Sequence, residues 1–250
     1  MNARGYLESV GVLCLLVLLW WITAYQGWVS RAFLPTPQAV AQSLVEGLGS
    51  GELANAGVAT IQRMLLGWGL ACLLGIALGA LIGTSSAARA WIQPTLEFIR
   101  PLPGAAVLPL AISIFGLSAT MVLVVVSFAS MWPVLLSTLH GFAALHNRLR
   151  EVAAALQISR PAFVWKLGLP NAVPDILAGM RLSMTVALIA AVVSEMISSQ
   201  FGLGQTILMA ARTFRAGELF AGIVLLGAIG FASNALLAIV ERRLLRWRNR

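Results

Sequence analysis

The feature that most constrains this chain is a series of apolar runs, each about as long as a bilayer is thick. A helix needs about 20 mainly apolar residues to cross the hydrocarbon core. Such runs occur near residues 10–28, 64–83, 101–116, 118–139, 176–197 and 218–240. The third and fourth must be separate, because the 39 uncharged residues at 101–139 would form a helix about 58 Å long. With a turn at the FGLS stretch (115–118), the sequence predicts an all-α, polytopic membrane protein with six transmembrane helices.

Composition agrees with membrane insertion and argues against several other classes. Only 10% of the residues are charged, whereas soluble domains have about 25%. The net charge of +8 comes from short cationic clusters beside apolar runs, which is typical of membrane orientation and not of nucleic-acid binding. Cys14 and Cys72 lie inside apolar runs, so we expect no disulfide framework. Two histidines, His140 and His146, are too few for a structural zinc site, and we expect no metal.

The N-terminal part is expected to differ from the rest. Its apolar run resembles a signal peptide, but the run continues to Trp28 with no small-x-small cleavage site, so we expect a retained helix. The segment FLPTPQAV (33–40) predicts a proline-stiffened turn, and 38–61 a weakly amphipathic helix. We therefore divide the chain into residues 1–62, the first transmembrane helix with an external connecting segment, and residues 63–245, the main transmembrane domain.

Arginine and lysine predict the orientation. With both termini in the cytoplasm, twelve of the 17 cations fall on the inner side, as the positive-inside rule requires. They are Arg4, Arg89, Arg100, Arg148, Arg150, Arg160, Lys166, Arg242, Arg243, Arg246, Arg248 and Arg250. Four fall outside (Arg31, Arg63, Arg212 and Arg215), and Arg181 lies within a span, where snorkelling would explain it.

One polar stretch, 148–170, interrupts the apolar pattern on the predicted cytoplasmic side. Leu149, Val152, Ala153 and Leu156 follow a helical spacing and predict a short amphipathic helix over 148–158. Pro161 suits the first turn of a second helix, which we expect to run to about Gly168 and to end at Leu169-Pro170. Two interpretations fit this pattern: a helix lying on the bilayer face, or a knob that inserts into a groove of a partner protein.

The same stretch resembles the cytoplasmic EAA loop of ABC importer permeases. That motif reads Glu-Ala-Ala, three residues, Gly, nine residues, Ile, one residue and Leu-Pro. Laid on this chain from Glu151, it puts Leu167 at the Ile position and Leu169-Pro170 in register, while Val152 replaces the first Ala and Gln157 the Gly. The resemblance implies that ATPase coupling involves Glu151, Ala153, Leu156, Gln157, Ser159, Arg160, Leu169 and Pro170. It also implies a coupling loop over 140–175.

The resemblance extends over most of the chain from about residue 33. FLPTPQAV, the segments 96–118, 131–142 and 169–196, and GLGQTI (202–207) are similar to the nitrate/sulfonate/taurine-type permeases. This family implies the transmembrane domain of a type I ABC importer in the bacterial inner (cytoplasmic) membrane. It implies as partners a second copy of the chain, a cytoplasmic ABC ATPase dimer and an external substrate-binding protein, besides the lipid bilayer.

Catalytic motifs are missing from the sequence. A P-loop requires a glycine-framed lysine, and the only lysine, Lys166, has no such frame. There is no GxSxG or HExxH motif, and Asp175 is the only aspartate. We therefore expect that this chain is not an enzyme, has no catalytic residues and carries no cofactor. The family resemblance implies a permease subunit whose partner ATPase binds the ATP and Mg.

A few residues are candidates for the translocation pathway or gate. Glu195 is the one acid deep within an apolar run, and an intramembrane carboxylate is a functional candidate. It could act at the outer gate, pair with Arg212 or Arg215, or lie shallow enough to reach water. Met131, Met184 and Met196 could line the pathway; alternatively, they fill gaps in the packing of the helices.

The leading interpretation is a permease for a small solute, an anion such as a sulfonate, taurine or nitrate, delivered by the binding protein. The alternative is an ion-coupled secondary transporter, which would require several ionisable groups near the membrane centre and symmetric broken helices. The sequence has one such acid and no internal repeat. A membrane scaffold would leave the stretch at 148–170 without a purpose.

Overall fold

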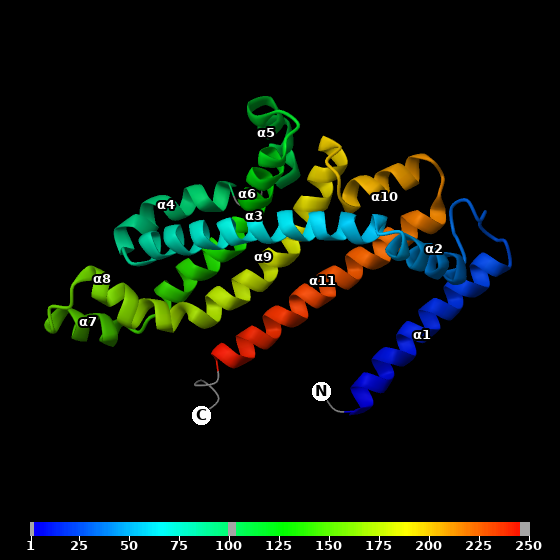
Figure 1. Ribbon diagram of the computed structural model, residues 1–250. Helices are drawn as coiled ribbons and strands as arrows, with labels where there is room; N and C mark the ends of the chain where they lie inside the picture. The colour runs from blue at the N-terminus through cyan, green and yellow to red at the C-terminus, as the bar shows by residue number, and fades with distance from the viewer. Residues whose placement is uncertain (1–2, 100–103, 246–250) are drawn as a thin grey trace. The chain divides into compact units, whose positions relative to one another are not determined.

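In the computed structural model, every regular element of the described part of the chain (residues 3–99 and 104–245) is helical (Figure 1). Within those ranges, four helices are long and apolar enough to cross a membrane. They are α3 (Glu52–Gly83), α6 (Ala119–Ala143), the helix Pro161–Ser198 that contains α9 (Leu169–Ser198), and α11 (Ala216–Leu244). α1 (Ala3–Tyr25) adds a shorter apolar segment, Gly11–Tyr25. The predicted all-α, multi-pass class is confirmed.

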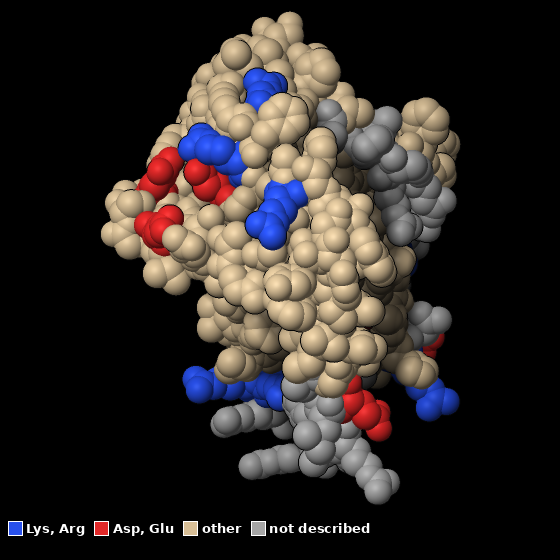
Figure 2. Space-filling model, turned by 90° about the vertical axis from the view of Figure 1, so that its right-hand side faces the viewer, with Lys and Arg blue, Asp and Glu red and all other residues tan. Residues whose placement is uncertain are grey.

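The surface of these helices is suited to lipid. Large apolar side chains such as Leu73, Leu81 and Phe231 are exposed along them. Uncharged residues make up most of the face shown in Figure 2. In a bilayer such side chains need no protein cover, because the surrounding lipid is equally apolar.

The predicted third span differs from its expected form. The segment 101–116 contains a 3₁₀ turn, η1 (Gly104–Val107), and the short helix α5 (Leu108–Phe115), while residues 100–103 lie outside the described part. Before these residues the chain forms another helix, α4 (Ser86–Ile99). The predicted turn at 115–118 is confirmed, since the Ser118 hydroxyl accepts a 3.2 Å hydrogen bond from the Met121 N–H at the start of α6.

The single helix predicted over 38–61 is wrong. The structure has α2 (Pro37–Gly49), then a turn at Gly51 with φ of 80°, and then α3 from Glu52. The start of α2 follows local capping rules: Pro37 occupies the first turn, and the Thr36 hydroxyl accepts a 3.3 Å hydrogen bond from the Ala39 N–H. The left-handed Gly51 separates the two helices, because this backbone conformation suits glycine and ends a helix.

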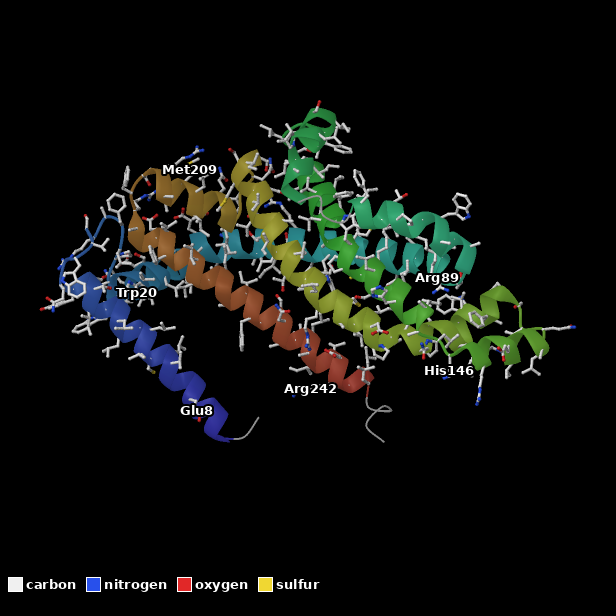
Figure 3. The ribbon with its side chains drawn as sticks, turned by 180° about the vertical axis from the view of Figure 1, so that it is seen from behind. Glu8, Trp20, Arg89, His146, Met209 and Arg242 are labelled. Carbon is white, nitrogen blue, oxygen red and sulfur yellow. The ribbon has the colours of Figure 1, made fainter. Side chains whose placement is uncertain are left out.

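The chain forms two compact units. Residues 1–59 and 201–228 make the first, which includes α1, α2 and α10 (Leu203–Arg212). Within it, the Trp20 indole (labelled in Figure 3) donates a 3.0 Å hydrogen bond to the Pro35 carbonyl and stacks on Phe220 with ring centres 5.8 Å apart. These contacts tie α1 to the proline turn and to α11.

Residues 60–200 and 229–250 make the second unit, in which α3 and α6 pack through small residues at four-residue spacing. Four glycines of α3 each face the residue 59 positions later: Gly67 faces Val126, Gly75 Val134, Gly79 Thr138 and Gly83 Phe142. The constant offset shows that the two helices run parallel. A Cβ at Gly79 would lie 2.6 Å from the Cβ of Thr138 and 2.8 Å from the carbonyl oxygen of Leu135. Only glycine permits this close approach.

α9 lies beside α6 in the same unit (Figures 1 and 3). A Cβ at Gly141 would lie 2.7 Å from that of Ala172, and one at Gly179 would lie 2.6 Å from that of Ser137. Interhelical hydrogen bonds reinforce this packing: the Ser183 hydroxyl donates to the Ser130 carbonyl at 2.6 Å, and the Trp68 indole of α3 donates to the Met180 carbonyl at 3.2 Å. The three helices therefore form one close-packed bundle.

Candidate functional site: a cytoplasmic-type loop and a buried charge cluster

The stretch predicted to couple to a partner forms α7 (Asn147–Ala155), α8 (Arg160–Phe163) and a π-helical turn η2 (Val164–Gly168), located between α6 and α9 (Figure 1). The predicted apolar stripe is present, but the chain itself covers little of it. Ala153 is buried, whereas Leu149, Val152 and Leu156 are exposed. Glu151 and Ser159 are also exposed, and the side chain of Arg160 lies outside the described part.

α7 ends in a left-handed residue at Gln157, where φ is 50°. The Ile158 N–H donates a 2.9 Å hydrogen bond to the Ala153 carbonyl across that turn, as in the motif that commonly ends a helix with glycine. Gln157 therefore adopts the conformation that the Gly of the EAA pattern would adopt. A side chain in this region costs about 1–2 kcal/mol, so the substitution strains the turn without changing its shape.

The prediction that Leu169-Pro170 ends the second short helix is wrong. A single helix runs from Pro161 to Ser198 through α8, η2 and α9. The Leu169 N–H bonds to the Val164 carbonyl, five residues back, and this wider turn accommodates Pro170. In an α-helix the proline ring would clash with the carbonyl four residues before it, and a π-turn relieves such a clash.

Phe142 at the end of α6 holds this helix in place. Its buried ring lies so close to Gly168 that a Cβ there would be 2.3 Å from it, and a Cβ at Gly83 would lie 2.7 Å from the Cβ of Phe142. Leu169 packs on the same cluster, with Ala172 and Ile176. The coupling stretch is thus anchored to α3, α6 and α9 together.

A second site lies near the other end of α9, at Glu195. Its carboxylate is fully buried; it accepts a 2.8 Å hydrogen bond from Arg63 Nη1 and a 2.9 Å one from Thr60 Oγ1, both on α3. Of the three alternatives weighed from the sequence, the shallow, water-satisfied carboxylate does not agree with this burial. The ion pair is present, but its partner is Arg63 rather than Arg212 or Arg215; Arg215 pairs with Glu218.

Sequence reasoning missed Arg63 and Thr60 as partners of Glu195. Arg63 is the cation immediately before the apolar run at 64–83, and Glu195 is the acid near the end of another run. Two lone opposite charges at the ends of two spans could have indicated a pair. Arg181, the cation predicted to lie within a span, is paired with Glu241 on α11.

The three methionine candidates lie in different surroundings. Met184 is buried in a cluster with Met64, Met121 and Val125, which is the setting of a packing residue. Met131 lines a groove of about 470 Å³ between α3 and α6, together with Leu70, Leu74 and Phe128. Met196 is partly buried one residue after Glu195. Their role in a pathway stays a prediction.

The described residues contain no group of three or more His, Cys, Asp or Glu side chains that could hold a metal ion. Residues 72–246 match the family of the binding-protein-dependent transport system inner membrane component. The chain belongs to this family. It is therefore a permease of the ABC importer class and not an ion-coupled secondary transporter.

Relatives place the permease in the nitrate/sulfonate/taurine-type branch. It is 32% identical over 250 residues to the taurine transport system permease of Escherichia coli, covering 98% of this chain and 91% of the relative. It is 31% identical over 245 residues to a Bacillus subtilis protein named for aliphatic sulfonates transport, covering 98% and 89%. It is 30% identical over 185 residues to the nitrate import permease of Leptolyngbya laminosa, covering 74% and 66%.

A solved structure confirms the fold of the permease. The crystal structure of an amino acid ABC transporter with histidines superposes with a TM-score of 0.62 at 21% identity, covering 80% of this chain and 97% of that one. Together with the family match, this agreement confirms the predicted fold, the transmembrane domain of a type I ABC importer.

Proposed function

We propose that this permease forms, as a homodimer, the translocation pathway of an ATP-driven importer in the bacterial cytoplasmic membrane. The observation that carries the proposal is the uncovered apolar side of α7, with Leu149, Val152 and Leu156 exposed beside Glu151. An amphipathic helix of this kind buries its apolar side in a partner's groove. The EAA-like register supports a cytoplasmic ABC ATPase dimer as that partner, and this dimer would bind the ATP and Mg.

The orientation follows from the distribution of cations, with both termini and the α7–α8 loop in the cytoplasm. An external substrate-binding protein then delivers the solute on the opposite side. Relatives named for taurine, nitrate and bicarbonate support a small solute with an oxyanion group. On this side Glu195 acts at the outer gate, because its bonds to Arg63 and Thr60 hold α9 against α3. A carboxylate would repel an anionic solute, so a role as a ligand of the solute fits Glu195 less well.

The docking proposal is tested with Glu151→Lys in the tagged permease, purified from its host membrane. The wild-type chain should co-purify with an ATPase subunit whose ATP hydrolysis is stimulated by a loaded binding protein. Glu151→Lys places a cation at the exposed surface of α7 and should abolish the stimulation, while the amount of permease in the membrane stays unchanged.

A matched control is Glu46→Lys, the same charge reversal on an exposed glutamate of α2. It should leave co-purification and stimulated hydrolysis intact. Normal coupling in Glu151→Lys would disprove docking through α7.

A further inference from the structure

A groove runs along the α6–α9 pair on the face where Gly104 and Ala129 lie. Its wider part, about 420 Å³, is lined by side chains that include Trp132, Ser137 and His140 of α6 and Leu182 of α9. A narrower part of about 100 Å³ continues from it, sharing Gly104, Ala129 and Val186, and reaches Val193 and Ser194. From Leu182 to Ser194 the groove extends about 18 Å along the helix axis.

Ser194 is the unusual residue of this groove. Its side chain is fully buried, and its hydroxyl has no hydrogen-bond partner among the described residues. Ser194 is also one of the residues that line the narrow part. Buried hydroxyls are ordinarily hydrogen-bonded, and an unpaired one costs free energy. The other buried serines of the described bundle follow the rule: Ser127, Ser130, Ser183 and Ser198 each donate to a carbonyl oxygen.

A second polar group comes from the backbone. Pro133 lies inside α6 and has no N–H, so the carbonyl of Ala129, four residues earlier, loses its normal helical donor. Ala129 lines both parts of the groove. Ser137 and His140 add side-chain hydrogen-bonding groups at the wide end, and the described lining residues include no acid.

We propose that this groove is the stretch of the translocation path that each subunit contributes, and that the Ser194 hydroxyl donates a hydrogen bond to an oxyanion group of the passing solute. The inference rests on the proposed function. An unpaired donor in an acid-free, largely apolar channel suits a compact solute that carries a sulfonate, carboxylate or nitrate group, because these groups only accept hydrogen bonds. A cation would find no carboxylate among the described lining residues and could not accept a hydrogen bond from Ser194; the Ala129 carbonyl would offer it an acceptor.

The first test compares Ser194→Ala with Ser183→Ala in the complete importer, using taurine and nitrate as probes. Ser194→Ala removes a hydroxyl that makes no bond to the described protein, so the unfolding temperature should stay the same or rise. Uptake should fall about tenfold or more, the loss expected for one hydrogen bond to a charged group. Ser183→Ala removes a hydroxyl that bonds to Ser130, so it should lower the unfolding temperature and leave uptake per folded molecule near normal. Unchanged uptake in Ser194→Ala would overturn the inference.

A second test needs no knowledge of the natural solute. Ser194→Cys and Ser183→Cys are made in a Cys14→Ser, Cys72→Ala background and treated, in membranes with the full complex, with methanethiosulfonate reagents. The sulfonatoethyl reagent should label position 194 faster than its trimethylammonium analogue does, and neither should label position 183. No labelling at 194, or faster labelling by the cation, would overturn the inference.

The two tests separate this inference from the proposed function. If the wild-type complex takes up neither probe and contains no ATPase, the importer proposal fails, and the labelling still decides whether Ser194 lines an anion-accepting channel. If the wild-type complex and Ser194→Ala both take up the probes normally, and neither reagent labels Ser194→Cys, the importer proposal stands and the path lies elsewhere.

Discussion

Arg63 and Glu195 meet 2.8 Å apart in the second unit, although 132 positions separate them in the sequence. The Glu195 side chain is fully buried, while 18% of the Arg63 side-chain surface is exposed. Removing one partner of a buried pair leaves the other charge without compensation, which is strongly destabilising. The pair therefore fixes the packing of α9 on α3 near the end of both apolar runs.

A double-mutant cycle measures this pair. Arg63→Met and Glu195→Leu should each destabilise the permease, and the double variant should be more stable than the sum of the single effects predicts. We expect a coupling energy of about 1–3 kcal/mol, measured by thermal unfolding in detergent. The exposed pair Arg181–Glu241 is the control, for which the same cycle should give about 0–1 kcal/mol. Equal coupling in the two cycles would contradict the assignment.

The variant Glu195→Gln tests whether Glu195 stabilises the closed state of the outer gate. The amide keeps the shape of the side chain but replaces charge-assisted hydrogen bonds to Arg63 and Thr60 with weaker neutral ones. The closed state should lose stability relative to the open state, so ATP hydrolysis by the complex without binding protein should rise. The solute affinity of the isolated binding protein should not change. Normal basal hydrolysis together with normal uptake would leave Glu195 a purely structural role.

Gly79→Val tests the small-residue contact between α3 and α6. The added side chain would collide with Thr138 and with the Leu135 carbonyl, where even a Cβ is too close. Overpacking of this kind costs about 1–3 kcal/mol or more, so the yield of folded protein and its unfolding temperature should fall. Gly69→Val on the same helix meets nothing within 4 Å of its Cβ and should be tolerated. Equal tolerance at both positions would refute the close packing.

The sequence was sufficient for the features that depend on local hydrophobicity and on local capping. The apolar runs indicated the long helices, and FGLS indicated the turn before α6. The glycine spacing at 67, 75, 79 and 83 could also have indicated the face that packs on α6, because a four-residue repeat of small residues marks a helix contact. That signal is local to α3.

Features that depend on distant residues could not be read in the same way. The partner of Glu195 lies on another helix, and several cations were equally plausible from the sequence. The continuation of the helix through Leu169-Pro170 depends on a π-turn that Phe142 and Gly168 hold together, whereas proline rules alone predicted a stop. The unpaired hydroxyl of Ser194 follows only from the absence of a neighbour in the described bundle.

Gln157→Gly should relieve the strained end of α7. Glycine adopts a positive φ without the cost of about 1 kcal/mol that a side chain incurs there. Hydrogen exchange of the α7 amides should therefore slow, and ATPase coupling should be preserved or improved. Gln157→Val places a β-branched residue in the same conformation and should speed exchange. Faster exchange in Gln157→Gly would show that the glutamine side chain makes a stabilising contact.

Cysteine labelling checks the orientation in a background without Cys14 and Cys72. Ala32 and Ser159 are both exposed, so accessibility does not bias the comparison. A membrane-impermeant maleimide added from outside should modify Ala32→Cys and not Ser159→Cys, and permeabilised membranes should show both. Modification of Ser159→Cys from outside would invert the topology and remove the basis for ATPase docking.

The continuous helix from Pro161 to Ser198 has a mechanical consequence. Its 38 residues span about 57 Å, with the α7–α8 loop at one end and both Ser194 and Glu195 close to the other. A force applied at α8 would tilt or rotate the helix as a rigid body. Ser194 and Glu195 would then move together with α8, and no chain of side-chain contacts would be needed to connect them. Coupling would then depend on the stiffness of this helix. A flexible insertion between the loop and the bundle should therefore permit ATP hydrolysis without transport of the solute.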